Sequence, residues 1–128
     1  MRIQFRAENF LSIKDSVVLS LLSSKDNEHP EHLIVDGSKR YLKSAVIYGA
    51  NASGKSNVLH AFWFMVNYVL TSHNQQLHKA IERSPFKFDC ETPSRPSCFE
   101  AIFTANGIRY AYGFSVTDKV VIEEYLYY

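Results

Sequence analysis

The chain has 128 residues, of which 46% are hydrophobic, and this is enough for one domain with a core and excludes an intrinsically disordered protein. Fourteen Lys and Arg against thirteen Asp and Glu give a net charge of +1, so no overall field attracts the protein to nucleic acid or to a membrane surface. No leader-like apolar segment opens the sequence, and its longest apolar-rich run, residues 58–70, is shorter than the ~20 residues of a membrane span. These features predict a cytoplasmic protein without a membrane partner.

Two paired strands are expected at the start of the chain. Apolar and polar side chains alternate over residues 1–8, which is the period of two of a half-buried strand. Residues 9–15 form a connection, and residues 16–22 form a second strand. The composition then turns polar over residues 23–40, which predicts a surface excursion with one short strand at 33–35.

A strand, a tight loop and a helix follow, in the order that a phosphate-binding P-loop requires. Residues 45–48 are β-prone and lie directly before a glycine, and residues 49–53 contain only small side chains and asparagine. The helix is expected over residues 54–71, roughly 25 Å at ~1.5 Å per residue. Because its apolar residues leave only a thin polar stripe, we expect this helix to pack between layers or against a partner.

The C-terminal third is predicted to be an antiparallel meander. A short helix through Leu77, Ala80 and Ile81 precedes it, before prolines break regularity. The three strands of the meander are expected at residues 99–104, 108–116 and 120–127. Asn106 and Gly107 between the first two strands indicate a type I′ hairpin.

The sequence GANASGKS at residues 49–56 carries the chemistry, because it matches the P-loop pattern of glycine, four residues and Gly-Lys-Ser. Gly49 and Gly54 allow backbone N–H groups to converge on phosphate oxygens, and the start of the helix adds its partial positive charge. Lys55 is the expected catalytic residue at the β and γ phosphates, and Ser56 is the expected Mg²⁺ ligand. The expected nucleotide-binding residues are Gly49, Ala50, Asn51, Ala52, Ser53, Gly54, Lys55, Ser56 and Asn57.

Two stretches resemble the ABC-type ATPases of the RecF, SMC and OLD-nuclease kind. Residues 2–14, RIQFRAENFLSIK, are similar to the first strand of those proteins and to the Asn-Phe-x-Ser turn that follows it. The second stretch is residues 47–57, in which Asn51 and Asn57 stand at the same places in and beside the P-loop as in those ATPases. The meander that ends at Tyr128 is further similar to the AAA-labelled, RecF-like ATPases of bacterial anti-phage and abortive-infection systems.

This resemblance implies an α/β fold, namely a P-loop NTPase lobe like an ABC-ATPase head with an antiparallel β meander. Its parts are strands in about 1–22, the P-loop and helix in 45–71, and the meander in 98–128. It implies ATP as the nucleotide, and in the complete protein Mg²⁺-dependent hydrolysis coupled to homodimerisation of the head and to control of DNA processing or phage defence. Since no signature loop and no convincing Walker B strand is found, we expect an N-terminal fragment that binds ATP but hydrolyses it poorly alone.

Other functions remain open. Residues 120–124 have apolar residues before two acids, as a Walker B strand does. Because the segment continues into residues 125–127 with the alternation of an ordinary β-strand, we favour a plain strand. The alternative function is a slow nucleotide-gated switch or interaction module that holds an effector such as a nuclease, and DNA is another candidate partner. A P-loop kinase or GTPase is a weaker alternative.

The resemblance also suggests further contacts with the nucleotide. Phe10, Ser12 and Lys14 are candidates for contacts with adenine or phosphates, against core packing for Phe10 and solvent exposure for Lys14. Gln75 and Gln76 are the glutamines downstream of the helix, where such ATPases often carry a sensor of the γ-phosphate. The alternative for both is a solvated loop.

The remaining residue types favour structural roles. Five histidines include His29 and His32, but no cysteine or defined carboxylate cluster accompanies this pair, so no zinc site is expected. Cys90 and Cys98 lack zinc or redox spacing and are expected to be reduced. The aromatic residues of 99–128 are expected in a sheet core or partner interface, in preference to a stacking platform for nucleic acid.

Overall fold

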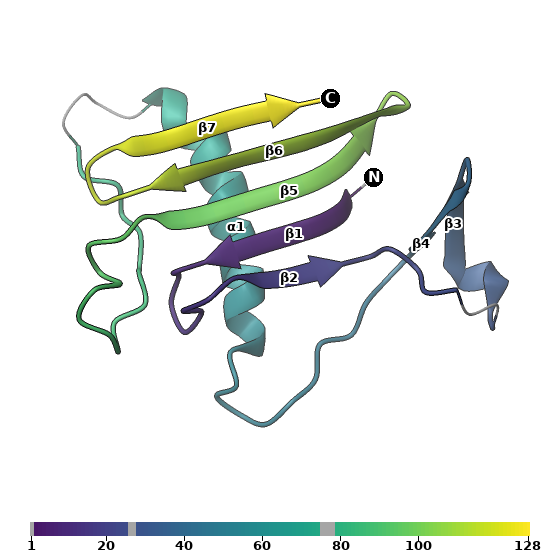
Figure 1. Ribbon diagram of the computed structural model, residues 1–128, viewed down its shortest axis with the longest axis horizontal. Helices are drawn as coiled ribbons and strands as arrows, with labels where there is room; N and C mark the ends of the chain where they lie inside the picture. Colours follow the sequence, from purple (N-terminus) through teal and green to yellow (C-terminus); the bar gives the residue numbers. More distant parts are fainter. Residues whose placement is uncertain (1, 26–27, 75–78) are drawn as a thin grey trace.

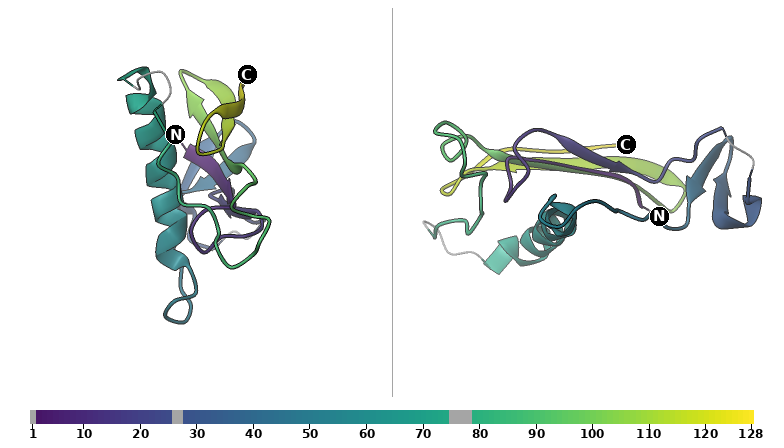
Figure 2. Two further views of the ribbon diagram at one scale, coloured as in Figure 1. Left: turned by 90° about the vertical axis from the view of Figure 1, so that its left-hand side faces the viewer. Right: turned by 90° about the horizontal axis from the view of Figure 1, so that it is seen from below.

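The computed structural model describes residues 2–25, 28–74 and 79–128. The strands are β1 (Arg2–Glu8), β2 (Val17–Ser20), β3 (Leu33–Asp36), β4 (Lys39–Leu42), β5 (Ser97–Ala105), β6 (Ile108–Val116) and β7 (Val121–Tyr127). The helices are α1 (Lys55–Thr71) and two 3₁₀ turns, η1 (Pro30–His32) and η2 (Ser72–Asn74). An antiparallel sheet of order β2-β1-β5-β6-β7 carries α1 across one face, and the hairpin β3-β4 stands apart from it (Figure 1, Figure 2).

The N-terminal strands pair as the alternation predicts. β1 lies antiparallel to β2, with Phe5 opposite Leu19, and the turn between them is closed by two backbone hydrogen bonds between Phe10 and Ile13. The short strand expected in the polar excursion is β3. Its partner β4 was not predicted, although Gly37, with φ +60°, supplies the left-handed turn between them.

The C-terminal meander is confirmed. β5 pairs with β6, and β6 pairs with β7, all antiparallel. Asn106 and Gly107 have φ of 52° and 77°, the two positive values that a type I′ turn requires. At the next turn Thr117 donates its N–H to the carbonyl of Val120. Local turn chemistry therefore identifies both connections of the meander.

Aromatic rings fix α1 on the sheet. At the middle of the helix Phe62 meets Phe5 of β1, with ring centroids 5.1 Å apart. Toward its end Tyr68 meets Phe114 of β6 at 5.2 Å. Phe64 lies between these contacts, over β5. The helix therefore crosses the strands, beginning at the β1–β2 edge and ending near β6 and β7 (Figure 1).

One face of α1 remains uncovered by the described residues. Trp63 is 67% exposed and Leu70 is 66% exposed. An apolar groove of about 680 Å³ also runs between the helix and β1, β2 and β5. Among the described residues α1 is therefore covered by the sheet on one side only, and packing of its other face against a partner stays a prediction. Despite this apolar surface, no helix in the described ranges is long and apolar enough to cross a membrane.

The strand predicted at residues 45–48 is wrong. These residues form no regular structure, and Val46 and Tyr48 are 84% and 88% exposed. A β-prone run becomes a strand only where a neighbouring strand completes its hydrogen bonds and covers its side chains. Among the described residues, none pairs with this segment.

The short helix predicted before the meander is also wrong where it can be assessed. Ala80 and Ile81 lie outside any helix, and Leu77 is outside the described residues. Ile81 is buried and donates its N–H to the carbonyl of Asp118 in the turn between β6 and β7. This long-range hydrogen bond takes the place of the i→i−4 hydrogen bond of a helix, and it cannot be predicted from the residues near Ile81.

Candidate functional site

The P-loop motif forms a turn-rich loop that leads directly into α1. The helix begins at Lys55, one residue after the start that the sequence predicts. Gly54 caps it with φ +89°, and a Cβ added there would lie 2.8 Å from the Ser12 hydroxyl oxygen. Both the left-handed backbone and the close neighbour therefore require glycine at this position. Ala52 is left-handed as well, with φ +64°.

The Lys55 side chain folds back over its own loop. Its Nζ donates to the carbonyl oxygens of Gly49 at 2.8 Å and Ala50 at 2.6 Å, and lies 3.5 Å from the Ser53 hydroxyl. An ammonium group offers three donors and no acceptor. The loop therefore satisfies the lysine with oxygen atoms, the same kind of partner that a phosphate would present.

The N-terminus of α1 is open to an anion. Gly54 provides no side-chain cap, and the first turn contains no acidic residue. The first N–H groups of a helix have no partner within it and carry the positive end of its dipole. Ser56 lies in this turn with an exposed side chain, and no described residue bonds its hydroxyl. Positive charge and free donors thus gather at one point.

The two stretches that carry the family resemblance meet beside the P-loop. Asn57 donates its side-chain amide to the Ser12 hydroxyl at 2.6 Å. Ser12 belongs to the turn between β1 and β2, 45 residues earlier in the chain. The turn therefore touches the helix start through Asn57 and faces Gly54, which ties the first strand to the P-loop.

The other candidates near the first strand do not reach the P-loop. Phe10 is 5% exposed and packs in the core, against Phe99 among others. Lys14 pairs with Asp89, with 2.6 Å between Nζ and Oδ2, and this hydrogen bond raises the pKa of Lys14. Of the three residues named from the resemblance, only Ser12 lies at the loop. Gln75 and Gln76 are outside the described residues.

Glu123 and Glu124 of β7, the two acids of the Walker B alternative, lie toward the C-terminal end of α1, whereas the P-loop lies at its N-terminal end. Glu124 accepts a hydrogen bond from the Tyr112 hydroxyl at 2.8 Å, and burial together with this carboxylate raises the pKa of Tyr112. The carboxylate also raises the pKa of Tyr68, after burial of that ring. At 1.5 Å per residue, Tyr68 is about 20 Å along α1 from Lys55. β7 is a plain strand, and the Walker B interpretation is rejected.

Asn9 is a site-supporting residue whose role the sequence did not reveal. It is 4% exposed and left-handed, with φ +52°, a conformation that asparagine tolerates. Its amide donates to the carbonyls of Thr92 and Arg95 at 2.8 and 3.0 Å, and its oxygen accepts from the Phe86 N–H at 3.0 Å. Asn9 therefore anchors the turn that carries Ser12 to the loop before β5.

The profile of one protein family, described as "AAA domain, putative AbiEii toxin, Type IV TA system", matches residues 44–127. That range covers more than half of the chain and includes the P-loop, α1 and the meander. The chain belongs to this AAA domain family. Membership in this AAA domain family indicates a nucleotide-binding domain of the P-loop ATPase type. No curated protein and no solved structure matches the chain.

Proposed function

We propose that the chain binds ATP with Mg²⁺ at residues 49–57, as the nucleotide-binding lobe of an ATPase. The observation that carries this proposal is the position of Lys55, whose ammonium lies among the oxygens of the P-loop at the uncapped start of α1. A triphosphate needs a fixed cation and a set of open N–H donors. Membership in the AAA domain family supports the same nucleotide class.

Each residue of the loop has a role in this proposal. On binding, phosphate oxygens replace the carbonyls of Gly49 and Ala50 around the Lys55 ammonium, which then acts as a point charge on the β and γ phosphates. The Ser56 hydroxyl is the Mg²⁺ ligand of the P-loop, since its side chain is exposed in the first turn of α1. Asn57 holds the loop against Ser12.

Hydrolysis in the complete protein requires groups beyond these residues. An attacking water must be oriented and the developing charge stabilised. Glu123 and Glu124 lie at the far end of α1 and cannot do this at the same P-loop. We therefore assign the missing groups to a homodimer of heads, as the resemblance to RecF-, SMC- and OLD-type ATPases implies, with control of DNA processing or phage defence as the output.

A slow nucleotide-gated switch is the second candidate function. It is favoured by the position of Glu123 and Glu124, which lie toward the far end of α1 and cannot orient an attacking water at this P-loop. Such a module would hold an effector, for example a nuclease, in one nucleotide state. Hydrolysis by the full chain separates the two: rapid, DNA-stimulated turnover supports a motor, and slow turnover with nucleotide-dependent assembly supports the switch.

The test of nucleotide binding is calorimetric titration with Mg-ATP and Mg-GTP. We expect ATP to bind in preference to GTP, and Lys55→Ala to weaken binding roughly 10–100-fold, because it removes a charge-assisted hydrogen bond. Lys119→Ala is the matched control, since Lys119 is exposed in the turn before β7 and the substitution removes the same charge. Equal affinity of the Lys55→Ala and Lys119→Ala variants would refute the proposed site.

A further inference from the structure

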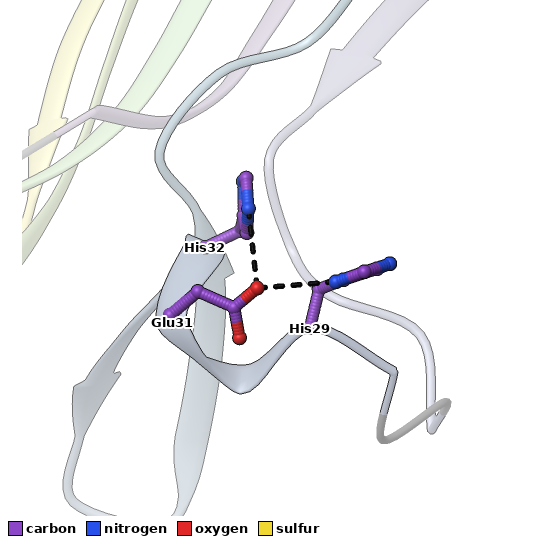
Figure 3. A group of neighbouring side chains, drawn as sticks. All are labelled: His29, Glu31 and His32. Atoms are coloured by element: carbon purple, nitrogen blue, oxygen red, sulfur yellow. Dashed lines mark hydrogen bonds and ion pairs between the residues drawn. The ribbon is translucent and has the colours of Figure 1, made fainter.

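The structure gathers three potential metal ligands on the η1 turn, remote from the P-loop. The Glu31 carboxylate oxygen Oε1 lies 3.1 Å from Nδ1 of His29 and 3.3 Å from Nε2 of His32. All three ligand atoms lie within 4.8 Å of one another. Figure 3 shows both imidazole rings turned toward the carboxylate. The carboxylate that the sequence did not associate with the two histidines is therefore supplied by Glu31.

We propose that His29, Glu31 and His32 form a binding site for a divalent transition metal ion of the zinc class. Two imidazole nitrogens and one carboxylate oxygen are a ligand set used for Zn²⁺, with water as the fourth ligand. Metal–ligand bonds of about 2.0–2.1 Å in a tetrahedron place neighbouring ligand atoms roughly 3.3–3.4 Å apart. The two separations from Glu31 lie close to that value, and the two imidazole nitrogens lie within 4.8 Å of each other.

The backbone of η1 holds the three ligands in place. His29 is left-handed, with φ 54°, and Pro30 begins the turn, which closes through the hydrogen bond from the His32 N–H to the His29 carbonyl at 3.0 Å. Lys43 ties the turn to the end of β4, because its Nζ donates to the Glu31 carbonyl at 2.8 Å and its N–H to the His32 carbonyl at 3.2 Å. Because the turn is already ordered, metal binding loses less conformational entropy than it would if the ligands had to be brought together.

The proposed site differs from the Mg²⁺ site of the P-loop in chemistry and in position. Mg²⁺ prefers six oxygen ligands in an octahedron, and imidazole nitrogen suits zinc-class ions. Figure 1 and Figure 2 both show β3, β4 and η1 beyond one end of the sheet, away from the start of α1. The ligand side chains are 61–75% exposed, so an ion reaches them directly from solvent. A bound ion would cross-link the turn that precedes β3.

The decisive experiment is titration of the full chain with Zn²⁺ by calorimetry in excess Mg²⁺, together with the visible absorption of Co²⁺ as a reporter of four-coordinate geometry. We expect one Zn²⁺ per chain. The variants His29→Ala, His32→Ala and Glu31→Gln should each weaken binding by at least ~10-fold. Loss of a residue that only hydrogen-bonds a metal ligand already costs about this much, and loss of the ligand itself should cost more. Glu31→Gln retains the shape and a hydrogen-bond acceptor, so it isolates the carboxylate charge.

His60→Ala is the matched control, because it removes an exposed imidazole on α1 and should leave the affinity unchanged. Circular dichroism of all variants should match the wild type, since the substituted side chains are exposed. Absence of stoichiometric Zn²⁺ binding, or binding that survives all three ligand substitutions, would overturn the proposal. The two histidines would then only share hydrogen bonds with Glu31.

Discussion

The segments on the two sides of the P-loop behave differently. After the loop, α1 is regular and its aromatic rings pack on the sheet, so that Ala61 and Met65 are buried. Before the loop, residues 45–48 are as β-prone as any in the chain, yet they are irregular and exposed. A helix satisfies its backbone hydrogen bonds internally, whereas a strand depends on a neighbour. The difference separates what the local sequence determines from what the tertiary context must supply.

The largest expected effect tests the packed side of this comparison. Phe99 is 1% exposed, and its ring centroid lies 5.1–5.5 Å from those of Phe10, Phe64 and Phe114. Phe99→Ala removes the ring that joins β5 to α1 and leaves a cavity, so we expect a loss of about 3–5 kcal/mol in the free energy of unfolding. Urea denaturation followed by circular dichroism measures this loss.

Phe88→Ala is the control for that substitution. Phe88 is 91% exposed, so the same change of side chain should alter stability by less than about 0.5 kcal/mol. If both variants lost similar amounts, the core would not be centred on Phe99, and the packing of α1 on the sheet would be wrong.

Gly54→Ala has the next largest expected effect and acts at the junction between the two segments. Alanine at φ +89° is strained, and its Cβ would lie 2.8 Å from the Ser12 hydroxyl oxygen. We expect a loss of about 1–3 kcal/mol in stability, together with weaker Mg-ATP binding because the P-loop shifts. Thermal denaturation and calorimetric titration measure the two effects.

Gly37→Ala separates strain from contact. Gly37 is also left-handed, with φ +60°, but nothing lies within 4 Å of an added Cβ. Its substitution should cost about 1–2 kcal/mol from the backbone alone and leave nucleotide affinity unchanged. Gly54→Ala should cost less stability in a Ser12→Gly background than in the wild type, and this comparison cancels the loss of the Asn57 hydrogen bond. An equal cost in both backgrounds would show that Ser12 does not crowd Gly54.

The sequence predicts those parts of the fold that short-range chemistry determines. The Asn106 and Gly107 turn, the alternation in β1 and the helix that begins at Lys55 all follow from residues close together in the chain. The P-loop motif is also recognised locally, because the pattern that identifies it spans only the eight consecutive residues 49–56. The expected binding roles of these residues nevertheless remain predictions until nucleotide binding is measured.

The features that sequence reasoning missed depend on distant partners. Asn9 makes hydrogen bonds with residues that lie between 77 and 88 positions later in the chain, and Asn57 bonds Ser12 at a separation of 45. The strand expected at 45–48 fails for the same reason, because its pairing depends on a neighbour that its own residues do not specify. The cluster of His29, Glu31 and His32 is a milder case, since Glu31 is adjacent to His32 but only the η1 turn brings the three side chains together.

Tyr125→Phe tests the sheet with a smaller expected effect. The Tyr125 hydroxyl donates to Oε2 of Glu100 at 2.6 Å across the face opposite α1. Loss of this bond should reduce stability by about 1 kcal/mol at neutral pH. Burial, and then the hydrogen bond to Glu100, raises the pKa of Tyr125 to about 12. Denaturation at several pH values measures both consequences.

The sign of the pH dependence follows from that raised pKa. Between pH ~10, where an unfolded tyrosine ionises, and pH ~12, the unfolded state binds fewer protons than the folded state. The stabilising contribution of Tyr125 is therefore complete below pH ~10 and is lost as the pH rises toward 12. The Phe variant should lack this part of the alkaline decline. Identical alkaline slopes in both proteins would mean that folding does not raise the pKa of Tyr125.

The smallest expected effect tests the exposed side of the comparison. Tyr48 is 88% exposed and belongs to no strand, so Tyr48→Ser should change the free energy of unfolding by less than about 0.5 kcal/mol. Hydrogen exchange should be fast for amides 45–48 and slow for those in the middle of α1, because only the helix amides are bonded. A loss above about 1 kcal/mol, or strong protection of amides 45–48, would mean that another strand pairs with this segment. In that case the β-propensity of the residues before the P-loop would be satisfied, and the contrast between its two sides would disappear.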